Sequence, residues 1–348
     1  EKVRVVLRVD GEEADVSQMT LGANSSTQVL FPCAFETAGS HTIEISVSAD
    51  DPLATDNRMA AAVNIWDKIT VLLVDGDPSG QPLKSETDFL SIALTPFTFG
   101  RVRLVDLVET QTVKPTAVNE ELLQSCRIVV LANVAKLDDA QLTALTAYVE
   151  QGGALLVTAG DRLDLNWYRE RLFADGTGLL PAPFGAMLGQ VDDKGAAARI
   201  VAERFDHPAL EFFNTPANGD LSKAEIRRWM KLELIDESVA KNGAATSVLA
   251  RLDTGDPLLL ERRFGQGDVI QLATTCDADW NDLPLRPFYV PLMQQLVTTM
   301  ASGLMPPRNI ATGDQAVVIL SGTEPGSTLS MLTPDGSRRT LQTVTEGN

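Results

Sequence analysis

Acidic side chains follow three strand-like runs, ITVLLVDGD, ALLVTAGD and DVIQLATT, at the point where each run ends. These acidic residues are Asp75, Asp77, Asp161, Asp277, Asp279 and Asp282. If the strands are parallel, their carboxyl ends meet at one edge of a sheet, and the carboxylates could face one crevice. Carboxylate oxygens are preferred ligands of Ca²⁺ and Mg²⁺. The pattern therefore makes these residues candidate metal or ligand contacts. Asp75 and Asp77 come first, because the first strand of a doubly wound sheet usually borders the binding crevice.

A simpler interpretation, which we favour, is that these residues are turn formers. Aspartate is common in turns because its carboxylate bonds the backbone two residues on. The chain is also acidic throughout, with 47 Asp and Glu against 29 Lys and Arg and a formal charge of −18. The turn DGDPSG lacks the glycine and lysine pattern of a phosphate loop, so we do not expect nucleotide binding.

Nucleophilic chemistry has few candidates, because the chain has three cysteines and two histidines, His41 and His207. Cys276 lies beside Asp277 and Asp279, whose charges disfavour a thiolate, so we expect it to be structural. Cys126 precedes an apolar run and fits a small buried side chain. We therefore predict no cofactor apart from the Ca²⁺ or Mg²⁺ considered above.

The elements that would position these residues alternate between strand and helix in the range 67–305. The runs ITVLLVDGD, RVRLVDL, RIVVLAN and ALLVTAGD read as strands, and SETDFLSIALTPF, with Ser85 as N-cap, VNEELLQSC and LDDAQLTALTAYVEQGG read as helices. We expect an irregular insertion at 161–245, then an antiparallel meander and a closing helix, RPFYVPLMQQLVTTMASG. This alternation predicts an α/β fold with a doubly wound, mostly parallel, flavodoxin-like sheet.

Both ends of the chain read as β structure. Residues 1–66 contain the β-rich runs VRVVLRV, STQVLFPCAF, HTIEISVS and RMAAAVNI, which predict part of a β-sandwich. Short β runs in 306–348 suggest the start of a further β-domain. The chain opens inside a strand-like pattern, so we expect it to be a segment of a larger protein.

The charge and hydropathy of the chain restrict its partners. A surface this acidic repels phosphate backbones, so nucleic-acid binding is not expected. No run reaches the about 20 apolar residues that a membrane-spanning helix needs. With 44% hydrophobic and 22% charged residues, the composition is that of a folded globular protein.

Two longer motifs carry a resemblance to a protein family. The segments DPLATDNRMAAAVNIWDKITVLLVDGDP and QGDVIQLATTCDADWNDLPLRPFYVPLMQQLV resemble parts of large bacterial membrane proteins of planctomycete type. Those proteins carry an N-terminal double-transmembrane region of the aerotolerance-regulator type, an Ig-like or CARDB-like β-domain and a class I glutamine amidotransferase-like domain. The resemblance covers about residues 1–305.

The resemblance implies an extracytoplasmic location, on the periplasmic side of the inner membrane, with anchoring helices outside this segment. It also implies a protein partner at the membrane. An active amidotransferase needs a cysteine at a sharp turn after a strand and a histidine to activate it. Here Asn133, Val134 and Ala135 occupy the corresponding turn, and His207 lacks the His-x-Glu pattern. We therefore expect no amidotransferase activity.

Three functional hypotheses remain open. The first is a non-catalytic interaction or scaffold segment. The second is a carbohydrate- or small-ligand-binding domain, for which the aromatic residues Trp66, Trp167, Tyr168 and Trp280 could form a platform, although core packing is the commoner role of such residues. The third is a metal-dependent hydrolase that uses the acidic crevice. The oligomeric state does not follow from the sequence.

Overall fold

The computed structural model describes most residues of the chain. They are 2–48, 53, 56–65, 67–98, 105–192, 197–202, 204–234, 246–303, 309–311, 313, 328–333 and 337–342. The chain divides into two compact units, Glu1–Leu304 and Met305–Asn348. The expected ranges 1–66 and 67–305 both fall in the first unit, except for residue 305, which belongs to the second unit.

The N-terminal part forms one antiparallel sheet of four strands in the order β2-β1-β3-β4. The strands are β1 (Lys2–Val9), β2 (Glu12–Thr20), β3 (Gly39–Ser48) and β4 (Arg58–Ile65). Val5 and Leu7 of β1 are buried and lie on one face, whereas Arg4 and Arg8 lie on the other and pair with Glu13 and Glu44. These residues follow the period-two pattern of a strand, but Val6, on the same face as the arginines, is buried as well.

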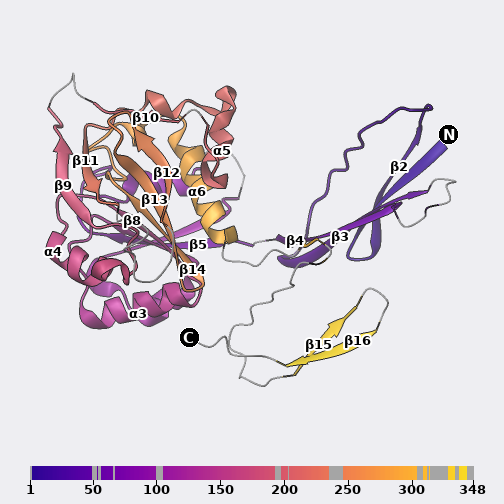
Figure 1. The fold of residues 1–348 in the computed structure, drawn as a ribbon, viewed down its shortest axis with the longest axis horizontal. Helices are drawn as coiled ribbons and strands as arrows, with labels where there is room; N and C mark the ends of the chain where they lie inside the picture. The colour runs from indigo at the N-terminus through magenta and orange to yellow at the C-terminus, as the bar shows by residue number, and fades with distance from the viewer. Residues whose placement is uncertain are drawn as a thin grey trace. The chain divides into compact units, whose positions relative to one another are not determined.

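The centre of the first unit is a mixed sheet of eight strands in the order β10-β12-β13-β14-β8-β7-β5-β6 (Figure 1). Its strands are β5 (Ile69–Asp75), β6 (Val108–Val113), β7 (Ile128–Ala132), β8 (Ala154–Thr158), β10 (Ile200–Val201), β12 (Thr246–Leu252), β13 (Pro257–Phe264) and β14 (Gly267–Leu272). The neighbours from β6 to β14 are parallel, and those from β14 to β10 are antiparallel. The chain therefore has an α/β fold, and its parallel strands follow the flavodoxin-like order 2-1-3-4-5.

Helices cover the sheet in two layers. The helices are α1 (Asp88–Leu94), α2 (Glu120–Ser125), α3 (Asp139–Glu150), α4 (Leu165–Trp167), α5 (Pro208–Glu211) and α6 (Tyr289–Gly303). Helices α1 and α5 both contact α6, whereas α2 contacts α3. Right-handed crossovers place α1 on one face of the sheet and α2 with α3 on the other.

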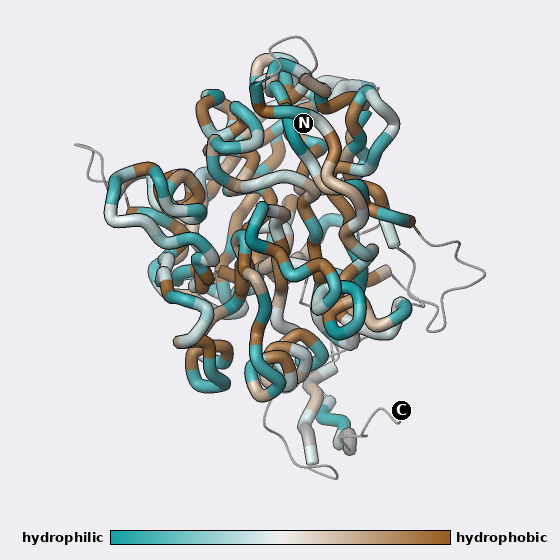
Figure 2. The backbone as a smooth tube through the Cα atoms, turned by 90° about the vertical axis from the view of Figure 1, so that its left-hand side faces the viewer, coloured by the Kyte–Doolittle hydropathy of each residue, from teal (hydrophilic) through white to brown (hydrophobic). Residues whose placement is uncertain are grey.

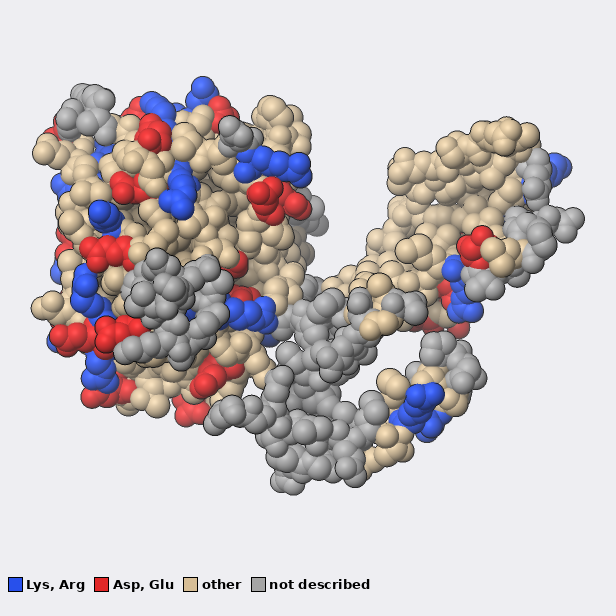
Figure 3. Space-filling view, viewed as in Figure 1, with Lys and Arg blue, Asp and Glu red and all other residues tan. Residues whose placement is uncertain are grey.

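The core lies between these layers, because the inner parallel strands are apolar on both faces. Every residue of β7 and β8 is buried, and hydrophobic stretches run through the middle of the unit (Figure 2). Helix α3 begins with a capping box, in which the Asp138 side chain accepts from the Gln141 N–H and the Gln141 side chain accepts from the Asp138 N–H. On the face shown in Figure 3, acidic and basic side chains are interspersed.

The insertion contains a small antiparallel pair of strands and several short turns of helix. The strands are β9 (Phe184–Gly189) and β11 (Arg228–Leu232). The short helical turns within it are η2 (Tyr168–Phe173, a π-helix), η3 (Ala174–Gly176), η4 (Phe212–Asn214), η5 (Pro216–Asn218) and η6 (Leu221–Lys223). Two further short turns, η1 (Pro115–Ala117) and η7 (Leu283–Leu285), lie outside the insertion. The insertion boundaries, 161–245, stay a prediction.

Three local predictions were wrong. The strand expected at RVRLVDL begins only at Val108, and residues 101–104 lie outside the described part. The run STQVLFPCAF is not a strand, whereas the more polar Glu12–Thr20 is. Ser85 does not cap α1, because the helix begins after Thr87 and the Ser85 hydroxyl instead bonds the backbone of Ser79.

The second unit, described by itself, contains an antiparallel pair of strands, β15 (Thr328–Leu332) and β16 (Arg338–Gln342). The expected run QAVVILSG lies outside the described residues. Among the described residues, no helix has the length and apolar character needed to cross a lipid bilayer.

Candidate functional site

The carboxyl ends of four parallel strands lie in register at one edge of the sheet. Asp75 of β5 pairs with Ala132 of β7, which pairs with Thr158 of β8, which in turn pairs with Leu272 of β14. The residues that follow each strand are therefore brought to the same edge. Strands β5 and β7 also form the point where the chain order reverses, which is where α/β sheets usually bind ligands. We treat this edge as the candidate site.

Asn133 occupies the turn directly after β7 in a left-handed conformation, with φ of 49°. Two glycines make room for it. A Cβ atom on Gly76 would lie 1.9 Å from the Asn133 carbonyl oxygen, and one on Gly160 would lie 2.0 Å from its side-chain Cγ. A non-glycine residue in this region of backbone space is uncommon and carries strain. The turn therefore has the tight, left-handed backbone that a nucleophile adopts at the elbow of hydrolase-type α/β folds.

The Asn133 side chain connects three loops by hydrogen bonds. Its amide nitrogen donates to Glu86 Oε1 at 2.5 Å and to Asp161 Oδ1 at 3.0 Å. Its amide oxygen accepts from the backbone N–H of Arg162 at 2.8 Å. Because both ends of the amide are engaged, Asn133 holds the loops after β5, β7 and β8 together.

Glu86 is the central acid of this site and is only 5% exposed. Its Oε1 accepts the bond from Asn133, and its Oε2 is buried without a hydrogen-bond partner among the described residues. Burial raises the pKa of Glu86 to about 8, and the neighbouring charge of Asp277, followed by those of Asp75 and Asp279, adds to the effect. Glu86 therefore holds a proton at neutral pH.

Asp75 and Asp77, the first candidates from the sequence, have different surroundings. Asp75 is buried and accepts from the Thr87 hydroxyl at 2.8 Å and from the Asp77 N–H at 3.0 Å. Asp77 is partly exposed, and its carboxylate lies 2.5 Å from the guanidinium of Arg162. Asp75 thus fixes the loop in front of α1, and Asp77 joins that loop to the one after β8.

The loop after β14 places Asp277 beside Glu86. Asp277 is buried, and its carboxylate accepts from the N–H of the exposed Asp279 at 3.0 Å. Burial, with a smaller contribution from the charge of Asp279, raises the pKa of Asp277. Asp282 has a separate role, because it accepts from the Glu225 N–H at 2.7 Å and pairs with Arg286.

The structure therefore groups the candidate acids unequally. Asp75, Asp277 and Asp279 surround Glu86 closely enough for their charges to affect its pKa, Asp161 joins the group through Asn133, and Asp282 lies apart. Within the described ranges, no group of three or more His, Cys, Asp or Glu side chains is arranged to hold a metal ion. A bound Ca²⁺ or Mg²⁺, which the sequence analysis considered but did not favour, stays a hypothesis.

The cysteines and histidines do not form a nucleophile and base pair. The Cys276 thiol is 2% exposed and donates to the Glu86 carbonyl at 3.1 Å, and burial raises its pKa well above the usual range. His41 contacts the Asp10 carboxylate and the Thr37 carbonyl. His207 contacts the Glu261 carboxylate and the Ala209 N–H. All ring nitrogens of both histidines thus have partners other than a thiol or hydroxyl.

The aromatic residues are mainly packing groups in the described part of the chain. Tyr168 is fully buried and donates to the Val134 carbonyl at 2.7 Å, and Trp167 packs against it edge to face. Trp280 is buried, and the Arg228 guanidinium lies 5.7 Å from its ring centre. Trp66 lies outside the described residues. A carbohydrate platform built from these residues stays a prediction.

Comparison with known proteins adds little beyond this geometry. No family model and no curated protein matches the chain. Among solved structures, a cytoplasmic protein of Salmonella typhimurium has a TM-score of 0.48 and 15% identity over 67% of this chain and 98% of that chain. A ThuA-like protein of Bacteroides uniformis has a TM-score of 0.44 and 11% identity over 70% and 94% of the respective chains. A β-galactosidase of Bacillus circulans has a TM-score of 0.42 and 12% identity over 68% of this chain but 31% of that enzyme. At these values the neighbours carry no functional argument.

Proposed function

We propose that the chain is a non-catalytic interaction or scaffold segment of a membrane-anchored, extracytoplasmic bacterial protein, built on an amidotransferase-like α/β domain that has lost its nucleophile. The N-terminal sheet would belong to an Ig-like or CARDB-like domain. The location and the protein partner at the membrane follow from the resemblance of the two sequence motifs described above. The role itself rests on the residues of the candidate site.

One observation carries the proposal. The elbow after β7 keeps the left-handed backbone, yet the residue there is Asn133, whose amide is fully engaged with Glu86, Asp161 and Arg162. An uncharged amide in this position is neither a nucleophile nor a general base. The nearby Cys276 does not replace it, since its thiol is buried and its pKa is raised.

Thiol reactivity tests the proposal. We expect iodoacetamide to alkylate the exposed Cys33 of the native chain rapidly and Cys276 only after unfolding, as followed by peptide mass spectrometry at neutral pH. Assays of glutamine and ester hydrolysis should give the same background rate for the wild type, Asn133→Ala and Cys276→Ser. Native labelling of Cys276 as fast as that of Cys33, together with a hydrolysis rate that either variant abolishes, would refute the proposal.

A further inference from the structure

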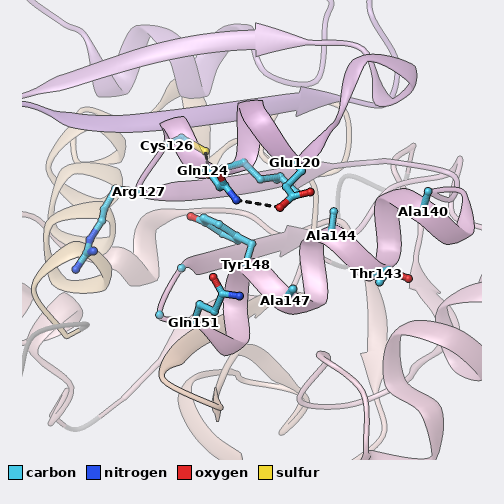
Figure 4. A pocket seen from close by; sticks show the side chains of 13 residues that line it. Glu120, Gln124, Cys126, Arg127, Ala140, Thr143, Ala144, Ala147, Tyr148 and Gln151 are labelled. Carbon is cyan, nitrogen blue, oxygen red and sulfur yellow. Dashed lines mark hydrogen bonds between the residues drawn. The ribbon is translucent and has the colours of Figure 1, made fainter. Parts of the chain in front are cut away.

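A separate cleft of about 550 Å³ lies between α2 and α3 (Figure 4). Its floor contains Cys126, Arg127 and Gly153, which come directly before β7 and β8. The candidate site follows the same strands, so the cleft lies at the opposite edge of the sheet. Its volume is in the range of small-ligand sites.

Small side chains keep this cleft open. Helix α3 lines it with Ala140, Ala144 and Ala147, whose spacing of four and three residues places them on one face of the helix. Gly153 allows the Tyr148 ring to lie over the floor, because a Cβ atom on Gly153 would be 2.3 Å from that ring. The methyl groups, the ring and Leu123 give the cleft an apolar wall.

Two groups of the floor, the Cys126 thiol and the Tyr148 phenol, are uncharged at neutral pH, whereas Arg127 is charged. Burial raises the pKa of the Cys126 thiol to about 11, and burial also raises the pKa of the Tyr148 phenol. Both groups are therefore protonated. A soft thiol and an aromatic ring favour the alkyl part of a ligand.

The negative charge of the cleft comes from Glu120 of α2. Its Oε1 accepts from the Gln124 side chain at 3.0 Å, and Figure 4 shows both side chains on the α2 side, facing Ala144 and the Tyr148 ring. Arg127 is the one basic residue among the described residues that line the cleft. Its guanidinium points away from Tyr148 in Figure 4 and donates to the Ala301 carbonyl at 3.4 Å. The negative charge of Glu120 therefore faces the cleft without a cation beside it there.

We propose that this cleft binds an alkylammonium or alkylguanidinium group, with its apolar stem on the alanine face of α3 and its cation between the Tyr148 ring and the Glu120 carboxylate. An aromatic ring attracts a cation placed over its face. Long basic side chains combine an apolar stem with a charged head. The net charge of −18 favours the approach of a cation. The same chemistry can come from a free diamine or from a Lys or Arg side chain of a protein partner. This inference does not rest on the proposed non-catalytic function.

Calorimetric titration of the whole chain tests the proposal with two probes, cadaverine and N-acetyl-lysine methylamide, and with pentanol as the uncharged control. We expect saturable binding of at least one cationic probe and none of pentanol. Binding of cadaverine alone identifies a free diamine as the source, and binding of the lysine derivative identifies a partner side chain. Both outcomes support the site.

Three variants locate the binding. Glu120→Gln should weaken it about fivefold, which is the size expected for an ion pair with an exposed carboxylate. Ala144→Leu should abolish it by filling the cleft. The matched control Glu121→Gln removes the neighbouring charge on α2, which does not line the cleft, and should bind like the wild type. The absence of binding by either probe, or equal binding by all four proteins, would overturn the proposal.

Discussion

At the residue scale, Glu86 makes the stability of the protein depend on pH. Folded Glu86 holds its proton up to a pKa of about 8, whereas the unfolded chain releases it near the ordinary glutamate pKa of 4.5. Between these values the folded state binds more protons, so stability is highest at low pH and is lost as the pH rises toward about 8. The loss in the free energy of unfolding is at most about 1.4 kcal/mol per pH unit. We expect Glu86→Gln, which mimics the protonated acid, to remove it.

Urea unfolding of the wild type and Glu86→Gln at a series of pH values from 4.5 to 8.5 measures this effect. The variant should match the wild type at the acid end and become more stable at the alkaline end. Asp277 also has a raised pKa, so it adds the same pH dependence of stability to both proteins. The difference in stability between the two proteins therefore reports Glu86. The exposed Glu170→Gln is the control and should show no such difference. Parallel stability curves for Glu86→Gln and the wild type would contradict the assignment.

The sequence indicated some residues of this edge and missed others for physical reasons. Asp75 and Asp277 were found because each follows an apolar run, which marks the end of a buried strand. Glu86 precedes a helix, where acids are ordinarily solvated and stabilise the helix end. It is buried here because the loop after β14 covers it, with Cys276 bonded to its carbonyl. That contact joins residues 190 positions apart, so local pattern could not reveal it.

At the element scale, the elbow after β7 depends on a glycine in the loop after β5. A Cβ atom on Gly76 would lie 1.9 Å from the Asn133 carbonyl oxygen, and the backbone there cannot turn aside as a side chain could. We expect Gly76→Ala to destabilise the fold by about 2 kcal/mol or more, the range of overpacking in a tight interior. Guanidinium unfolding measures the change.

Gly80 provides a matched control in the same loop, because a Cβ atom there would meet nothing within 4 Å. Gly80→Ala should lower the free energy of unfolding by about 0.5 kcal/mol at most. It should even raise it slightly if the lower entropy of the unfolded chain decides the outcome. Similar losses of stability for the two variants would show that helix or loop propensity causes the loss, and not the contact between the Cβ atom at position 76 and Asn133.

The elements with strong hydrophobic patterns were predicted well, and the polar ones were not. Strands β5, β7 and β8 have continuous apolar runs because neighbours cover both of their faces. Strand β6, VETQTV, lies at the edge of the sheet and keeps mostly polar side chains, so its sequence did not indicate a strand. The polar strand β2 is also an edge strand, in the N-terminal sheet. Edge strands tolerate such side chains because they are partly solvated.

At the scale of the whole molecule, the parallel sheet separates two kinds of chemistry. The carboxyl edge holds a cluster of acids on neighbouring loops, and hydrogen bonds from Asn133 join these loops. The opposite edge holds the cleft between α2 and α3, whose floor includes the protonated Cys126 thiol and the Arg127 guanidinium. If the first edge has become structural, as the proposed function states, partner recognition falls to other surfaces, and the cleft is one that the structure provides.

The division into two compact units gives the last prediction. The hydrophobic core of the α/β part runs from Ile69 to Ala301 and includes none of the described residues in 309–342. We therefore expect removal of residues 305–348 to shift the main unfolding transition by less than about 2 °C, which corresponds to less than about 1 kcal/mol for a core of this size. Scanning calorimetry of the two chains measures the shift, and cadaverine titration of the shortened chain tests whether the cleft is retained. Because Ala144 and Glu120 belong to the first unit, binding should be unchanged. A transition that falls by more than about 5 °C would show that the second unit stabilises the first.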